Sequence, residues 1–192
     1  RAIPNLNVIR PADANESREA WIAAVSNRSS PTVLAFTRQP VATLDRSLLA
    51  PANGLHRGAY VLGDLGGGRP QIILMASGSE VQLIVQAGYS LAAQGYNVRL
   101  VSFPSWFMFE RQDSVYKDDV LPPTIKRRLA IEAGISLGWE RYVGDNGRVI
   151  AVDRFGASAP YKRIFEEYGL TVDRVIDEAR MMLGAGNSEG RW

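Results

Sequence analysis

The chain has no cysteine and only one histidine, His56, among its 192 residues. The lack of cysteine excludes disulfides, thiolate metal sites and a cysteine nucleophile, and it fits an intracellular protein. A single histidine also excludes histidine-rich metal sites and catalytic histidine pairs. Because His56 lies in a segment without regular periodicity, we expect a surface or interface residue, with no partners for chemistry.

An excess of charge and long apolar runs are also missing. Twenty-two Lys and Arg stand against 20 Asp and Glu, and the two signs are interleaved. The basic stripe of a nucleic-acid binder is absent, and no apolar run approaches the roughly 18 residues that a membrane span needs. We therefore expect neither nucleic acid nor a membrane as a partner. No leader pattern opens the chain, and the start at Arg1 without methionine suggests a truncated or processed product.

The first 39 residues predict a strand, a helix and a second strand. Apolar residues 6–9 form the first strand, and Asp13 with Glu16 three positions later has the spacing of a capping box. Residues 32–36, TVLAF, form the second strand. The helix between them should bury one apolar face, made of Ala20, Trp21, Ala24 and Val25.

Residues 40–57 show neither a helical nor a strand period and run longer than ordinary connections. We interpret them as a linker between two domains. Beyond it, predicted strands alternate with helices as far as residue 183, and residues 184–192 form a tail. This order predicts an α/β fold with a doubly wound, mostly parallel sheet, one edge strand of which can be antiparallel, and helices on both faces. The strands are expected at residues 59–62, 72–76, 97–102, 128–132 and 148–153, and helices at 104–109, 114–121, 135–143, 160–169 and 172–183, besides one that starts after Ser77 or Ser79.

The stretch QIILMASGSE, residues 71–80, is the centre of this pattern: a buried strand, a tight turn and a helix start. Ligands of open α/β sheets collect at such strand ends, so the hydroxyls of Ser77 and Ser79 and the free helix amides could hold an anion. The alternative, which motif logic favours, is a structural turn with a serine as helix cap. The glycines at 66–68 precede the strand and so fail as a phosphate-binding fingerprint. A serine hydrolase is disfavoured because the G-x-S-x-G elbow is missing.

Three further sets of side chains are candidates for function. Glu132 and Asp153 end successive predicted strands and could form an acid–base pair, although carboxylates at such positions more often cap loops or pair with residues such as Arg154. Arg38 follows a predicted strand and could grip a phosphate or carboxylate, or form a salt bridge. The aromatic residues fall at amphipathic helical positions, which favours packing in the core or at a subunit interface: Trp106, Phe107, Phe109, Trp139 and Tyr142.

Seven stretches, in this order and spacing, resemble the carboxyl-terminal third of transketolase, over residues 1–183. They are IPNLNVIRPADANE from Ile3, LAFTRQP from Leu34, GAYVL from Gly58, ASGSEV from Ala76, RLVSFPSW from Arg99, VLPPTIKRRLAIEAG from Val120, and GWERYVG followed by DRFGASAP.

The resemblance implies a division of the chain and an activity for the protein to which it belongs. Residues 1–39 would end the pyrimidine-binding domain, 40–57 would be the linker, and 58–183 would be the carboxyl-terminal domain. Members of the family are homodimers that use thiamine diphosphate and Mg or Ca to transfer a two-carbon ketol unit between ketose and aldose phosphates, in the pentose phosphate pathway and the Calvin cycle. Their location is cytoplasmic, or plastid in photosynthetic eukaryotes.

One functional residue carries over from the family. Arg38 in TRQ resembles the arginine of the SRQ motif, which binds the terminal phosphate of the sugar substrate. Three positions differ from the family pattern: Thr37 replaces a serine, Ser77 replaces the threonine of TGSE, and Ala59 replaces a glycine of GGY. The resemblance places catalytic, cofactor-binding and metal-binding residues before Arg1, so we expect none of them in this chain, which alone would be inactive and would support dimerisation.

Two alternatives remain open on the sequence. One is a sister enzyme of the dihydroxyacetone synthase type, which the sequence upstream of Arg1 would distinguish. The other is a non-catalytic module that binds an anion or nucleotide at the ASGSE turn.

Overall fold

The computed structural model describes residues 1–184 of the chain. The predicted tail, residues 184–192, lies outside this part apart from Gly184. Within the described residues, no helix is both long enough and apolar enough to cross a membrane.

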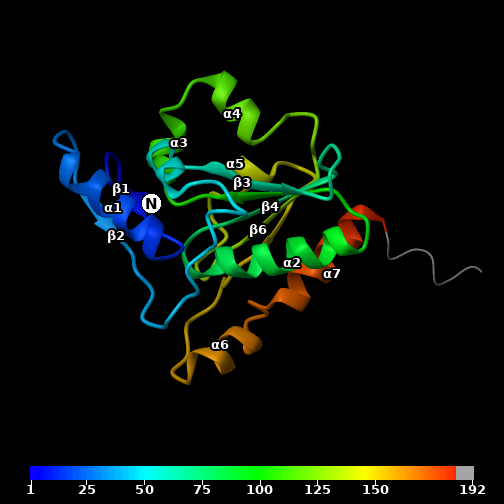
Figure 1. Ribbon diagram of the computed structural model, residues 1–192. Coiled ribbons are helices and arrows are strands. Elements are labelled where there is room, and N and C mark those ends of the chain that lie inside the picture. The colour runs from blue at the N-terminus through cyan, green and yellow to red at the C-terminus, as the bar shows by residue number, and fades with distance from the viewer. Residues whose placement is uncertain (185–192) are drawn as a thin grey trace, which may run out of the picture.

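A five-stranded sheet in the order β3-β5-β4-β6-β7 forms the centre of the molecule (Figure 1). Strand β3 runs antiparallel to β5, and the other neighbours are parallel. This confirms the doubly wound, mostly parallel α/β fold with an antiparallel edge strand. The bounds are β3 (Tyr60–Leu65), β4 (Ile72–Ala76), β5 (Val98–Ser102), β6 (Arg128–Ile131) and β7 (Arg148–Ile150).

Helices cover both faces of this sheet, which is why its central strand is apolar throughout. Along β4, Ile72, Leu74 and Ala76 join the core beneath α2 (Val81–Ala93) and α7 (Val172–Leu183). Ile73 and Met75 point the other way, into the core shared with α3 (Trp106–Glu110), α4 (Ser114–Val120) and α5 (Glu140–Val143). Figure 1 shows these two groups of helices on opposite sides of the strands.

Two helix predictions show how local chemistry sets the ends. The predicted helix 135–143 was too long, because only its last turn, α5, is helical. Gly138 has a left-handed φ of 95° and lies against the Trp106 ring, which interrupts the helix before α5. The last helix was predicted correctly: Thr171 Oγ1 accepts a hydrogen bond from Arg174 N at 3.2 Å and so caps α7. The remaining helix is α6 (Tyr161–Glu167).

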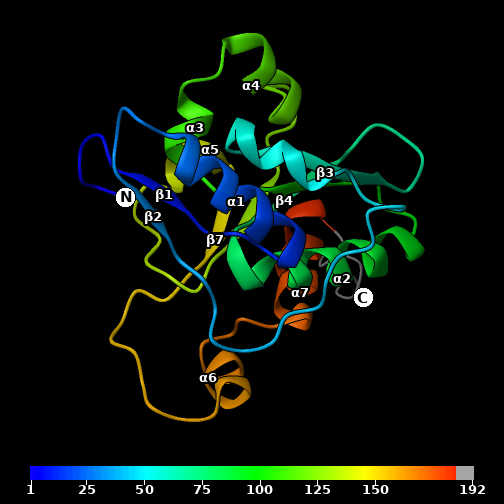
Figure 2. The ribbon, with the colours of Figure 1, turned by 60° about the vertical axis from the view of Figure 1, so that its left-hand side comes forward.

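The strand–helix–strand at the start of the chain forms a separate small layer beside the main sheet (Figure 2). It consists of β1 (Asn7–Ile9), α1 (Ala14–Ser26) and β2 (Thr32–Leu34), with β1 and β2 parallel, and is called the N-terminal unit below. Asp13 caps α1 as predicted, accepting from Glu16 N at 2.8 Å. The predicted buried face was largely wrong: Ala20 is buried, but Trp21 is 57% and Val25 75% exposed. A two-stranded sheet is too small to cover both sides of the helix.

The segment predicted as a linker is irregular up to residue 51 and then forms the 3₁₀ helix η1 (Ala52–Arg57). Leu55 of η1 is fully buried in a small core with Ile9 and Ala20 of the N-terminal unit. The segment therefore packs against that unit and carries the chain over to β3.

Candidate functional site

Arg10 follows β1 directly and enters the main sheet at the carboxyl ends of β4 and β6. Its backbone is held on both sides, because Arg10 N donates to Pro104 O at 2.9 Å and Gly78 N donates to Arg10 O at 3.0 Å. Gly78 has a φ of 62°, and a Cβ there would lie 3.1 Å from Arg10 Nη2. Glycine at this position thus allows the turn after β4 to approach the arginine.

The guanidinium of Arg10 bridges two buried carboxylates. Nη2 donates to Glu80 Oε2 at 3.0 Å, and Nη1 donates to Glu132 Oε1 and to Ser77 Oγ. Burial would lower the pKa of Arg10, but the charges of Glu80 and Glu132 outweigh that effect and raise it. The arginine is therefore a permanent cation that joins the N-terminal unit to the sheet.

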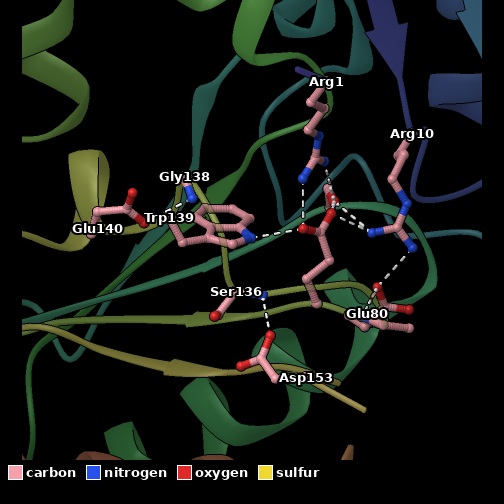
Figure 3. Close-up of polar contacts among 11 residues, drawn as sticks. Arg1, Arg10, Glu80, Ser136, Gly138, Trp139, Glu140 and Asp153 are labelled. Carbon is pink, nitrogen blue, oxygen red and sulfur yellow. Dashed lines mark hydrogen bonds and ion pairs between the residues drawn. The ribbon is translucent and has the colours of Figure 1, made fainter. Parts of the chain in front are cut away.

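Glu132 is the centre of this cluster and is only 2% exposed. Its Oε2 accepts from Arg1 Nη1 at 2.5 Å and from Trp139 Nε1 at 2.7 Å, and its Oε1 accepts from Ser77 Oγ at 2.7 Å. Figure 3 shows Arg1, Arg10 and Trp139 converging from three sides. Burial alone would raise the pKa of Glu132, but the hydrogen bond and charge of Arg1, with Arg10 and Ser77, lower it to about 2. The carboxylate is thus ionised, paired and poorly suited to exchange protons near neutral pH.

The ASGSE turn is fully engaged by this cluster. Ser77 donates to Glu132, and Ser79 donates to Glu80 Oε1. Neither hydroxyl caps the helix in the described structure, so the predicted serine cap was wrong. The chain instead makes a short 3₁₀ turn, Gly78–Glu80, before α2. With two carboxylates beside it and both hydroxyls donating to them, the turn presents a cation-binding environment, which the Arg10 guanidinium fills.

Glu132 and Asp153 do not share a crevice. Glu132 is buried, whereas Asp153 is exposed and accepts from Ser136 N at 2.8 Å, capping the loop after β6 (Figure 3). Arg154 also turns away, because its Nη2 donates to Glu167 O at 3.1 Å. The loop-capping alternative thus describes Asp153, and the acid–base pair does not form.

A second buried contact joins the N-terminal unit to the sheet. Glu16, which is fully buried, accepts from Ala12 N, from Tyr60 Oη at 2.7 Å and from Ser102 Oγ at 2.6 Å. Burial raises the pKa of this carboxyl, and the three hydrogen bonds counteract the rise. On the outer side, His56 Nε2 lies 2.8 Å from Glu19 Oε2, as expected of an interface residue.

Arg38 lies four residues beyond the end of β2, which is shorter than predicted, and it is exposed. It lines an open pocket of about 600 Å³ with Gln39, Ser158 and Tyr161, among others. Within residues 1–184, no acidic side chain lines this pocket and no ion pair involves Arg38. The guanidinium is therefore available to an anionic ligand.

The aromatic side chains predicted to pack together do so around Phe103, which the sequence patterns did not single out. Its ring meets Trp139 at 5.6 Å and Tyr142 at 4.5 Å between centroids. Trp106 packs edge-on against Trp139 and carries the Arg1 guanidinium 4.1 Å above its ring. The cluster thus supports the charged site from one face of the sheet.

Sequence reasoning missed Arg1 and Arg10 altogether. Arg10 had the same signal as Arg38, an arginine just after a short apolar strand, but the strand in the sequence looked too short to attract attention. No pattern marked Arg1. In the part of the chain that the structure describes, no three His, Asp or Glu side chains gather as a metal site.

The fold and these contacts define a doubly wound α/β domain that is joined, through buried arginine–carboxylate pairs, to the end of a second α/β unit. Residues 58–171 match the family model described as the transketolase-like TK C-terminal domain, and residues 1–43 match the transketolase pyrimidine binding domain. The chain belongs to the transketolase family.

Curated and solved transketolases agree with this assignment. The transketolase of Geobacillus stearothermophilus is 52% identical over 184 residues, which are 96% of this chain and 28% of that protein. The structure of transketolase from Leishmania mexicana superposes with a TM-score of 0.87 at 34% identity, over 100% of this chain and 27% of that one. A Pichia stipitis transketolase complex with sedoheptulose-7-phosphate has a TM-score of 0.86 at 33% identity, over 96% of this chain and 26% of that one. The chain thus spans little more than a quarter of these relatives.

Proposed function

We propose that this chain is the carboxyl-terminal part of a transketolase that transfers a two-carbon ketol unit between sugar phosphates. In this proposal residues 1–39 end the pyrimidine-binding domain, 40–57 link the domains and 58–183 form the carboxyl-terminal domain. The whole enzyme is a homodimer with thiamine diphosphate and Mg or Ca, located in the cytoplasm or in a plastid. Its residues for catalysis and cofactor binding lie outside this chain.

The exposed guanidinium of Arg38 carries the proposal for the substrate. It lines an open pocket whose described lining has no carboxylate to compete for it. A fork of guanidinium donors suits a phosphate oxygen pair. We assign Arg38 to the terminal phosphate of the sugar.

The test replaces Arg38 by alanine in the full-length enzyme. A charge-assisted hydrogen bond of roughly 1.5–3 kcal/mol corresponds to a loss of about 10- to 150-fold in kcat/KM. We expect that loss for ribose 5-phosphate as acceptor and little change for an unphosphorylated aldose. Arg28→Ala, which removes an equally exposed arginine outside this pocket, is the control. Equal losses for both acceptors would contradict the assignment.

The inactivity of the isolated chain is a second part of the proposal. Its support is the exposed apolar surface of the N-terminal unit, where Trp21, Val25, Val33 and Phe36 are 45–75% exposed. Such a surface indicates that more of an α/β domain packs there. Calorimetry of the 192-residue chain with thiamine diphosphate and Mg should show no binding, and a micromolar Kd would refute this.

A further inference from the structure

The amino ends of β4, β6 and β7 surround an open pocket of about 780 Å³. The loops that lead into these three strands line it, together with the end of α7. This is the opposite edge of the sheet from Glu132 and Ser77, which lie at the carboxyl ends of β6 and β4. In Figure 1 the red end of α7 lies far from the blue N-terminal unit, so the pocket is separate from every contact described above.

Four cations line the pocket: Arg69 before β4, Lys126 and Arg127 before β6, and Arg148 at the start of β7. Among residues 1–184 no acidic side chain joins them in the lining. The chain as a whole is nearly balanced, with 22 basic and 20 acidic residues, so this one-sided group is a local concentration of positive charge.

Two of the arginines are held in place by neutral partners, which leave their charge uncompensated. Arg69 Nη2 donates to Thr124 Oγ1 at 2.7 Å and so joins the loops before β4 and β6. Arg127 Nε donates to Met182 O at 2.8 Å, at the end of α7. Each guanidinium keeps further N–H groups for a ligand.

The other two cations differ in how free they are. Arg148 donates to Glu178 Oε2 at 2.6 Å, so part of its charge is spent on that pair. Lys126 is exposed and forms no ion pair within the described residues. Three cations of the pocket therefore lack a carboxylate partner there.

We propose that this pocket binds an oligophosphate, a chain of two or more linked phosphate groups. A single phosphate can contact only some of the cations, whereas linked phosphates can reach from the β4 loop to the β6 loop and satisfy both. The described lining holds no aromatic ring on which a base could stack. The phosphates alone are thus recognised, and a nucleoside attached to them adds little.

The experiment titrates the full 192-residue chain with sodium tripolyphosphate by calorimetry at low ionic strength. We expect one saturable site, with ATP bound within about threefold of tripolyphosphate and orthophosphate at least about tenfold more weakly. Raising the salt to physiological strength should weaken the binding, because exposed charges are screened. ATP binding far more tightly than tripolyphosphate, or orthophosphate binding equally well, would overturn the proposal.

Charge-neutral variants test the location of the site. Arg69→Gln combined with Lys126→Gln should weaken tripolyphosphate binding by about tenfold or more. The matched control is Arg28→Gln combined with Lys162→Gln, which removes the same charges at exposed positions outside the pocket and should leave binding unchanged. Equal weakening by both pairs would refute the site. Affinity that grows with the length of a single-stranded oligonucleotide would instead indicate a nucleic-acid surface.

Discussion

Replacing Glu132 by glutamine should strongly destabilise the chain. The side chain keeps its shape but loses the charge that faces Arg1 and Arg10, and breaking a buried ion pair on one side costs about 3–5 kcal/mol. The lowered pKa leads to a similar figure: a shift from 4.5 to about 2 corresponds to about 3 kcal/mol of preference for the ionised form in the folded state. We expect the free energy of unfolding at pH 7 to fall by about 3 kcal/mol in urea denaturation.

The pH dependence gives this prediction a sign. The pKa of Glu132 is lower in the folded chain, so its contribution is fully present above pH 4.5 and is lost as the pH falls toward 2. By pH 3 about 2 kcal/mol of it should be gone. The stability gap between the native chain and Glu132→Gln should therefore narrow between pH 6 and pH 3. A gap that stays constant over this range would refute the account of the cluster.

Asp153→Asn is the matched control, because it removes the same charge from the neighbouring strand end. Asp153 is exposed, and asparagine can still accept from Ser136 N. We expect a change within about 0.5 kcal/mol at pH 7. If both variants lost equal stability, net charge rather than the buried pairing of Glu132 would be the cause.

Three further variants test the packing around the site, all by urea denaturation. Trp139→Phe removes the indole donor to Glu132 and should cost about 1–3 kcal/mol, more than Trp106→Phe, whose Nε1 has no partner in the described structure. Gly58→Ala should cost more than about 2 kcal/mol, because its Cβ would lie 2.1 Å from Phe109 N, whereas Gly67→Ala meets open space and should cost about 1 kcal/mol. Tyr60→Phe takes one of three donors from buried Glu16 and should cost about 1.5–3 kcal/mol; an unchanged midpoint would contradict that role.

The sheet was predictable because its strands carry their own signal. A run such as Ile72 to Ala76, apolar at every position, is expected of a strand covered on both faces, and the glycines and prolines between runs mark the turns. The apolar stripe of α7 and its Thr171 cap gave the last helix in the same way. The face of α1 was not predictable, since Trp21 and Val25 have the spacing of a buried face whether or not the covering chain is present.

The contacts of the site were much harder to predict than its elements. Glu132 was found as a carboxylate at a strand end, but its partners come from residues 55 to 131 positions away, a separation that no local pattern encodes. Pairing with Asp153 looked reasonable because β6 and β7 are neighbours. Burial decided the matter: a buried carboxylate needs a cation, and Arg10 supplies it.

The position of Arg10 explains why the most site-like turn in the sequence has a structural role. In open α/β sheets the carboxyl ends of the strands form the crevice where ligands bind. Here the guanidinium of Arg10 occupies the space between Glu80 and Glu132, and the backbone of Gly78 closes on it. A crevice filled in this way fixes β1, and with it β2 and the segment that carries Arg38, relative to the sheet. The charged cluster therefore acts on substrate binding only through position, which is why its loss should appear first in stability.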